Sequence, residues 1–154
     1  MAEHIWSVLC YKGCIDKFTE QISLLEVVEA LTVPYGSSPA ELMETGLDVS
    51  LQLVSLWMRS GIEIPEVAYS RLSLQVPDGS IAERDELEVD LRKRPRIRTF
   101  FKMAALPFRG IGLYTLIIEQ RDGANDCWKQ VAGIPLEIGT EPESVAHLHR
   151  SQSS

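Results

Sequence analysis

The chain has 154 residues, of which 45% are hydrophobic and 24% are charged, and its formal net charge is -7 at pH 7. This composition is typical of one globular domain and excludes a largely disordered chain, and the acidity argues against a protein that coats nucleic acid without sequence preference. No apolar run approaches the roughly 20 residues of a membrane-spanning helix, and the first residues lack the basic region of a secretory signal, so we expect a cytoplasmic protein without a membrane span.

The first expected strand covers residues 4–12, which are apolar on both sides of a two-residue period. Such a pattern is typical of a central strand covered on both faces. After a polar turn, Ser23 and Glu26 form the S-x-x-E pattern that caps the start of a helix. Apolar residues follow at helical spacing, namely Leu24, Val27, Val28 and Leu31. The sequence therefore predicts a short amphipathic helix that begins at Ser23.

A second capping pattern begins at Ser38. Pro39 occupies the first helical position, Glu41 follows, and Gly46 is placed to end the turn. This arrangement favours a short helix, but residues 35–46 fit a loop as well.

From Gly46 onward the pattern is that of strands. On one side of the two-residue period in 47–57 lie Leu47, Val49, Leu51, Leu53 and Trp57. Such alternation predicts a strand with one buried face. Similar segments follow at 69–76, 87–91, 97–103, 114–118 and 128–138, with turn residues at 77–79 and 122–126. The spacing indicates antiparallel hairpins.

We therefore expect a mainly β protein, a two-layer antiparallel β-sandwich of the immunoglobulin-like or C2-like kind, with one or two short helices. The domain would span residues 1–138, and residues 139–154, which lose the pattern, would form a flexible tail. We expect Trp6, Trp57 and Trp128 in or near the core, because all three fall in expected strands.

Six of the basic residues in this acidic chain lie within residues 92–102. Arginine side chains bind carboxylates or phosphates in bidentate fashion, and an aromatic residue between cations is typical of an interaction surface. The candidate binding residues are Arg92, Arg94, Arg96, Arg98, Phe100 and Lys102.

The same segment also fits a purely structural interpretation, a hairpin with its tip at 93–95. The simplest register places Asp90 opposite Arg98 and Glu86 opposite Lys102. It also brings together two apolar pairs, Leu91 with Ile97 and Leu87 with Phe101. Charges would then pair on the solvent face and apolar residues would meet in the core.

Two stretches carry a family resemblance. Residues 5–9 are followed by an aspartate-bearing turn and by 23–33, and a second stretch consists of Leu106, Pro107, Phe108, Gly110, Gly112 and Tyr114 before an apolar strand. Together they resemble an uncharacterised family of small bacterial β-sandwich domains, over residues 4–138. The resemblance implies a sandwich fold and carries no catalytic residues.

The cysteines Cys10, Cys14 and Cys127 are three, an odd number for a disulfide framework. In a reducing compartment we expect free thiols and no structural disulfide. Cys10 and Cys14 with His147 and His149 have zinc-ligating chemistry. Because Cys10 falls in an expected buried strand and the histidines fall in the expected tail, we expect no zinc site.

Acidic turns at Asp78, Asp122 and Asp126 are similar to the loops that hold calcium in membrane-docking sandwich domains. Each turn has too few carboxylates by itself, and Asp-Gly is ordinary turn chemistry, so we expect no metal and no cofactor. No serine or cysteine lies in a nucleophile motif, and no glycine loop opens a helix.

The expected function is therefore non-enzymatic binding or assembly with another protein through 92–102. One alternative is binding of an anion, a nucleotide or nucleic acid by the same basic segment. A second alternative is a hydrolase whose site forms only in three dimensions. A homo-oligomer is left open.

Overall fold

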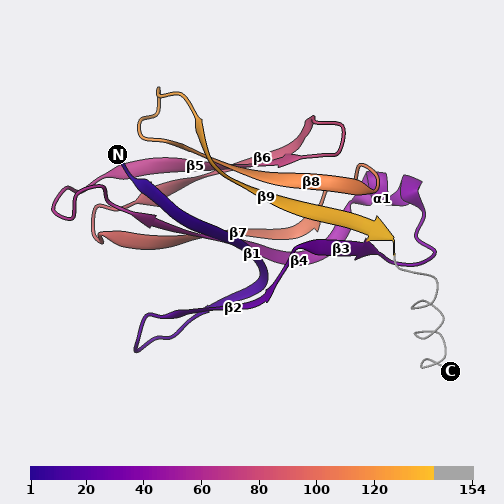
Figure 1. The fold of residues 1–154 in the computed structure, drawn as a ribbon, viewed down its shortest axis with the longest axis horizontal. Coiled ribbons are helices and arrows are strands. Elements are labelled where there is room, and N and C mark those ends of the chain that lie inside the picture. Colours follow the sequence, from indigo (N-terminus) through magenta and orange to yellow (C-terminus); the bar gives the residue numbers. More distant parts are fainter. Residues whose placement is uncertain (141–154) are drawn as a thin grey trace.

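The computed structural model describes residues 1–140 and shows a mainly β protein, as the sequence predicts (Figure 1). Its elements are β1 (Glu3–Ile15), β2 (Ile22–Val27), β3 (Ala30–Val33), α1 (Pro39–Thr45), β4 (Leu47–Met58), β5 (Val67–Gln75), β6 (Ile81–Asp90), β7 (Arg96–Leu106), β8 (Gly112–Arg121) and β9 (Lys129–Thr140). Residues 139 and 140 of the expected tail belong to β9, and 141–154 lie outside the described residues. Within 1–140, no helix has the length and apolar character needed to cross a membrane.

The strands form two sheets. Sheet A has the order β2-β1-β4-β7, and sheet B has the order β3-β9-β8-β5-β6. All neighbouring strands are antiparallel except β3 and β9, which are parallel. The expected hairpins at 77–79 and 122–126 are confirmed, because they join β5 to β6 and β8 to β9.

One hydrophobic core lies between the two sheets. Leu9, Leu53 and Phe101 are paired across three strands of sheet A and are all buried. Sheet B contributes the buried side chains of Leu72, Leu74, Leu116, Ile118, Leu136 and Ile138. The predicted buried face of 47–57 is confirmed by Leu51, Leu53 and Trp57. Trp57 is fully buried and donates from Nε1 to Thr99 Oγ1 at 2.9 Å.

The helix predicted from Ser23 is wrong, because residues 22–27 form strand β2. The pairing of β1 with β4 ends at Cys10, but β1 continues to Ile15. Its last residues pair with β2 instead, with Cys10 opposite Val27 at one end and Ile15 opposite Ile22 at the other. Glu26 adopts a φ of 55°, and the chain then leaves sheet A to enter β3 of sheet B. Strand pairing overrides the capping pattern here.

The second expected helix is confirmed as α1. Gly46 ends it with a φ of 76°, and its backbone N–H donates to the Leu42 carbonyl. A Cβ on Gly46 would lie 2.9 Å from the Leu106 carbonyl oxygen. Both the left-handed backbone and this close approach require glycine.

The expected hairpin between 86–91 and 97–102 is wrong. β6 pairs with β5 in sheet B and β7 pairs with β4 in sheet A, so residues 91–95 cross from one sheet to the other. This arrangement lets Leu87 and Val89 of β6 and Ile97 and Phe101 of β7 pack on the core from opposite sheets. Leu91 is fully buried at the crossing.

The crossing is held by Arg59 at the end of β4. Its guanidinium donates to three backbone carbonyls, those of Leu91 at 2.6 Å, Ile62 at 2.7 Å and Arg92 at 2.7 Å. The Arg59 N–H also donates to the Pro95 carbonyl at 2.9 Å.

β1 bends sharply after Cys10, where its pairing with β4 ends. Its second half and β2 form a hairpin, residues 11–27, which turns back against the outer face of sheet A (Figure 1). Gly13 N–H donates to Gln52 Oε1 at 3.3 Å, and a Cβ on Gly13 would lie 3.2 Å from Phe100 Cε1. Val54 is fully buried although it lies on that outer face, because the β1–β2 hairpin covers it.

Candidate functional site

The candidate basic residues 96, 98 and 102 lie in a row on strand β7. Arg96 is opposite Met58, Arg98 is opposite Leu56, and Lys102 is opposite Gln52 of β4. These positions alternate with the core positions of the same strands, so the row follows the outer face of sheet A. β7 ends its sheet, and the cations therefore lie along an edge strand.

Arg98 and Phe100 are the half-buried members of this strand face. The Phe100 ring lies near Gly13 and Val54 under the β1–β2 hairpin. It is therefore not the freely exposed aromatic that a solvent-facing hairpin would present. Arg98 Nε is buried and has no hydrogen-bond partner among the described residues. Leaving a charged donor unpaired is costly.

Arg92 and Arg94 lie apart from the row, in the crossing between the sheets. Arg92 forms ion pairs with Asp90 at 2.9 Å and Glu88 at 3.4 Å. Its hydrogen bond lowers the pKa of Asp90 to about 2. Arg94 approaches Glu20 at the tip of the β1–β2 hairpin, at 3.8 Å. These two arginines are thus engaged within the chain.

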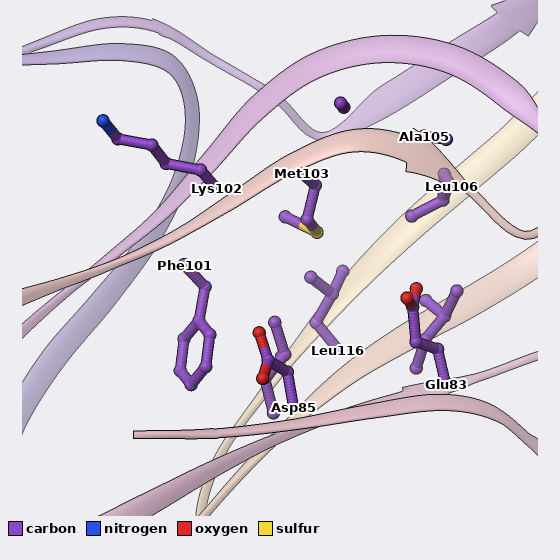
Figure 2. A pocket seen from close by; sticks show the side chains of 11 residues that line it. Glu83, Asp85, Phe101, Lys102, Met103, Ala105, Leu106 and Leu116 are labelled. Atoms are coloured by element: carbon purple, nitrogen blue, oxygen red, sulfur yellow. The ribbon is translucent and has the colours of Figure 1, made fainter. Parts of the chain in front are cut away.

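On the other face of β7 lies a groove between the two sheets, with a volume of about 260 Å³. Figure 2 shows Phe101, Met103 and Leu106 of β7 pointing toward the opposite wall, where Leu116 lies, while Lys102 points away. Leu72 and Leu74 of β5 complete the apolar lining. Sequence reasoning missed this groove, because it exists only where β7 faces sheet B.

Two carboxylates stand at the rim of the groove. Glu83 and Asp85 of β6 are paired with Leu74 and Leu72, so they share the core-facing side of sheet B, yet both are exposed (Figure 2). β6 ends sheet B as β7 ends sheet A. Inward-pointing charges are a common protection of an edge strand, and they make this rim acidic.

The residues considered for zinc do not come together in the described part of the chain. Cys10 is buried, Cys14 is half-buried and Cys127 is exposed, all as free thiols. Burial raises the pKa of the Cys10 thiol, which opposes the thiolate that a metal needs. His147 and His149 lie outside the described residues. Within 1–140, no group of three or more metal-ligating side chains forms.

The two acidic turns considered for calcium lie at opposite ends of sheet B. β5 and β8 pair from Tyr69–Arg121 to Gln75–Thr115, so Asp78 follows one end of this ladder and Asp122 follows the other. The ladder alone spans roughly 20 Å. Asp126 stays in its own turn, where its carboxylate accepts from the Gly123 N–H at 2.7 Å.

A hydrogen-bonded chain of His4, Ser7 and Ser55 is a further site that sequence reasoning missed. His4 Nε2 lies 2.7 Å from Ser7 Oγ, which lies 2.6 Å from Ser55 Oγ. Burial lowers the pKa of His4, and its ring packs edge-on against Trp57 with centroids 5.0 Å apart. Ser55 is 1% exposed, so these hydrogen bonds supply partners to polar side chains inside the protein. Only the register of β1 on β4 brings these serines together.

Trp128 lies on the outer face of sheet B and not in the core. The guanidinium carbons of Arg71 and Arg121 stand 4.6 Å and 4.4 Å from its ring centroid. Arg71 Nε also donates to Glu119 Oε2 at 2.7 Å. This cation–π cluster joins β5 and β8 to the residue that directly precedes β9. Trp6, on β1, is half-buried.

No protein-family model matches this chain, and no curated protein is significantly similar to it. The resemblance to small bacterial β-sandwich domains therefore stays a prediction.

Proposed function

We propose that this chain is a cytoplasmic, non-enzymatic protein-binding module, built as a two-layer β-sandwich, whose partner contacts strand β7. The single observation that carries the proposal is the row of Arg96, Arg98 and Lys102 along an edge strand, in a chain of net charge -7. The sandwich assignment is supported by the single hydrophobic core that residues of both sheets share.

The local charge indicates what kind of surface the partner has. Three cations at alternate or nearby positions of one strand face favour an acidic surface, because complementary charge speeds association and excludes wrong partners.

Nucleic acid is the competing ligand for the same cations. Binding of single strands usually combines cations with aromatic rings on which bases stack. The Phe100 ring lies near Gly13 and Val54 instead, and the proposal therefore favours a protein.

The test is affinity capture from an extract of the native host, with retained proteins and nucleic acids both identified. Wild type is compared with the triple variant Arg96→Glu, Arg98→Glu, Lys102→Glu. The matched control is Lys17→Glu, Arg84→Glu, Lys129→Glu, which changes the net charge equally at exposed positions elsewhere. We expect a protein that wild type and control retain and the β7 variant loses.

Two outcomes would contradict the proposal. Equal capture by all three proteins would show that β7 is not the contact surface. Retention of nucleic acid alone, lost steeply between about 50 mM and 200 mM salt, would assign the row to the anion-binding alternative.

A further inference from the structure

We infer that the partner adds an extended segment of alternating apolar and acidic residues to the free edge of β7, as a fifth strand of sheet A. This inference rests on the proposed function and specifies how the same surface recognises its partner.

The backbone of β7 offers a free edge to another strand. It is paired with β4 from Arg96 to Leu106, and it is the last strand of its sheet. Alternate N–H and C=O groups of an edge strand point away from its neighbour and form a template for another strand. Ala104 and Ala105 are exposed on this strand, and such small side chains leave the edge open to approach.

The groove beneath that edge can receive side chains of an added strand. Side chains of an added strand alternate between the two faces of the sheet, so every second one would point between the sheets. There the cavity of about 260 Å³ is lined by Phe101, Met103 and Leu116. It is smaller than the roughly 300–1,000 Å³ typical of small-molecule pockets, and it suits a few apolar side chains of a peptide.

The two faces of an added strand would meet opposite charges. The other side chains of the added strand would lie next to Arg98 and Lys102 on the outer face, where acidic residues are attracted. Glu83 and Asp85 stand at the rim of the groove and repel acidic residues that point inward. A shift of one residue exchanges the two faces, so these opposite charges select one of the two registers.

A second copy of this chain is a poorer occupant. Pairing of β7 with another β7 would place two rows of cations side by side, and like charges across a strand pair are destabilising. The charge of the row thus favours a different, acidic segment.

The test uses the full chain and a fluorescent peptide of about ten residues that alternates valine and glutamate. We expect saturable binding by fluorescence anisotropy at low salt, together with slower hydrogen exchange of backbone amides in β7. A peptide of the same composition with valine and glutamate in blocks should bind at least roughly tenfold more weakly, which corresponds to about 1.4 kcal/mol.

N-methylation gives a matched control for strand addition. Methyl groups on the alternate amides of one peptide edge should abolish binding, while methyl groups on the other edge should leave it unchanged, because a single edge of the added strand bonds to β7. Equal effects of the two peptides would contradict the inference.

A charge-swap variant tests the recognition of acidic residues. The double variant Arg98→Glu, Lys102→Glu should bind the valine–glutamate peptide at least tenfold more weakly, which corresponds to roughly 1.4 kcal/mol. The same variant should gain binding of a valine–lysine peptide. Failure to gain that binding would overturn the charge argument, provided that the thermal unfolding of the variant matches wild type.

The inference and the proposed function can fail separately. If the extract partner depends on Arg96, Arg98 and Lys102 but no peptide binds below about 1 mM, the binding module stands and strand addition is wrong. If the peptide protects β7 amides but the triple variant captures the same proteins as wild type, β7 can accept a strand but is not the surface that the native partner uses. Concentration-dependent dimers with protected β7 amides would identify a second copy as the occupant and overturn the inference.

Discussion

Gly13 and Phe100 lie against each other across the outer face of sheet A, so that a Cβ on Gly13 would be 3.2 Å from Cε1 of Phe100. This contact joins the β1–β2 hairpin to the strand that carries the candidate binding row. The hairpin can lie this close because residue 13 has no side chain.

The variant Gly13→Val should therefore be destabilised by about 1–3 kcal/mol, because the added methyl groups overpack against Phe100 and Val54. Urea unfolding measures the change. The control is Gly139→Val, since a Cβ at 139 meets nothing within 4 Å. If both variants unfold at the same urea concentration, the contact between hairpin and β7 is not a tight one.

Replacing Arg59 by lysine should destabilise the protein by about 1–3 kcal/mol. One ammonium group cannot reproduce three bonds from a planar guanidinium to the carbonyls of Leu91, Ile62 and Arg92. Thermal or urea unfolding checks this, with the exposed Arg84→Lys as the matched control. An Arg59→Lys protein as stable as wild type would mean that these three bonds do not stabilise the crossing.

The burial of His4 predicts how stability depends on pH. Its pKa is lowered in the folded protein, so the unfolded chain binds the proton first, and stability falls as the pH drops below the unfolded value near 6.5. The urea midpoint measured from pH 7.5 down to 5.5 should decrease in wild type. His4→Gln should show a flatter dependence over this window, and an unchanged slope would locate the proton uptake elsewhere.

Asp90 provides a local measurement of the Arg92 contact. Its pKa is held at about 2 by the hydrogen bonds from Arg92, so it should be ionised throughout the range in which exposed aspartates titrate. Carboxyl NMR should report this value in wild type and a higher pKa in Arg92→Ala, still below 3.8 because the backbone N–H of residue 92 continues to donate to Asp90 Oδ1. Because the folded pKa is depressed, the contribution of this pair to stability is present above the unfolded value and is lost as the pH falls toward 2.

The Arg71–Glu119 pair should matter more than an exposed ion pair. Both side chains are less than a fifth exposed, and Glu119→Gln would leave the Arg71 guanidinium beside Trp128 without its counterion. We expect a loss of about 1–3 kcal/mol. A double-mutant cycle with Arg71→Met isolates the pair, and a coupling energy near zero would assign the Arg71 contribution to the ring contact alone.

Much of the strand pattern could be predicted from the sequence, because alternation records which face is buried. Leu47, Leu51, Leu53 and Trp57 show this for β4. Pairing could not be predicted in the same way. A hairpin register would pair the charges of 86–102, whereas in the observed register Arg98 and Lys102 lie opposite Leu56 and Gln52. The pairing is decided by burial of the apolar residues of both strands between the two sheets, which charge matching does not report.

The helix predicted at Ser23 failed for a related reason. A capping pattern and a helical stripe report only local preference for a helix. Pairing of residues 22–27 with the end of β1 is a tertiary interaction, and it overrides that local preference. For the candidate site, the parity of Arg98, Phe100 and Lys102 followed from spacing. The groove beneath them did not, because its walls come from β5, β6, β7 and β8.

The parallel pairing of β3 with β9 has a consequence for biosynthesis. Ala30 pairs with Glu137 and Val33 with Thr140. Sheet B therefore cannot be completed until translation has passed residue 140. At 5–20 residues per second, β3 waits roughly 5–20 s for its neighbour. During that interval its exposed backbone is open to chaperones and to misassembly. In chains that end in the β8–β9 turn, β3 would have no neighbour and β8 would keep only β5.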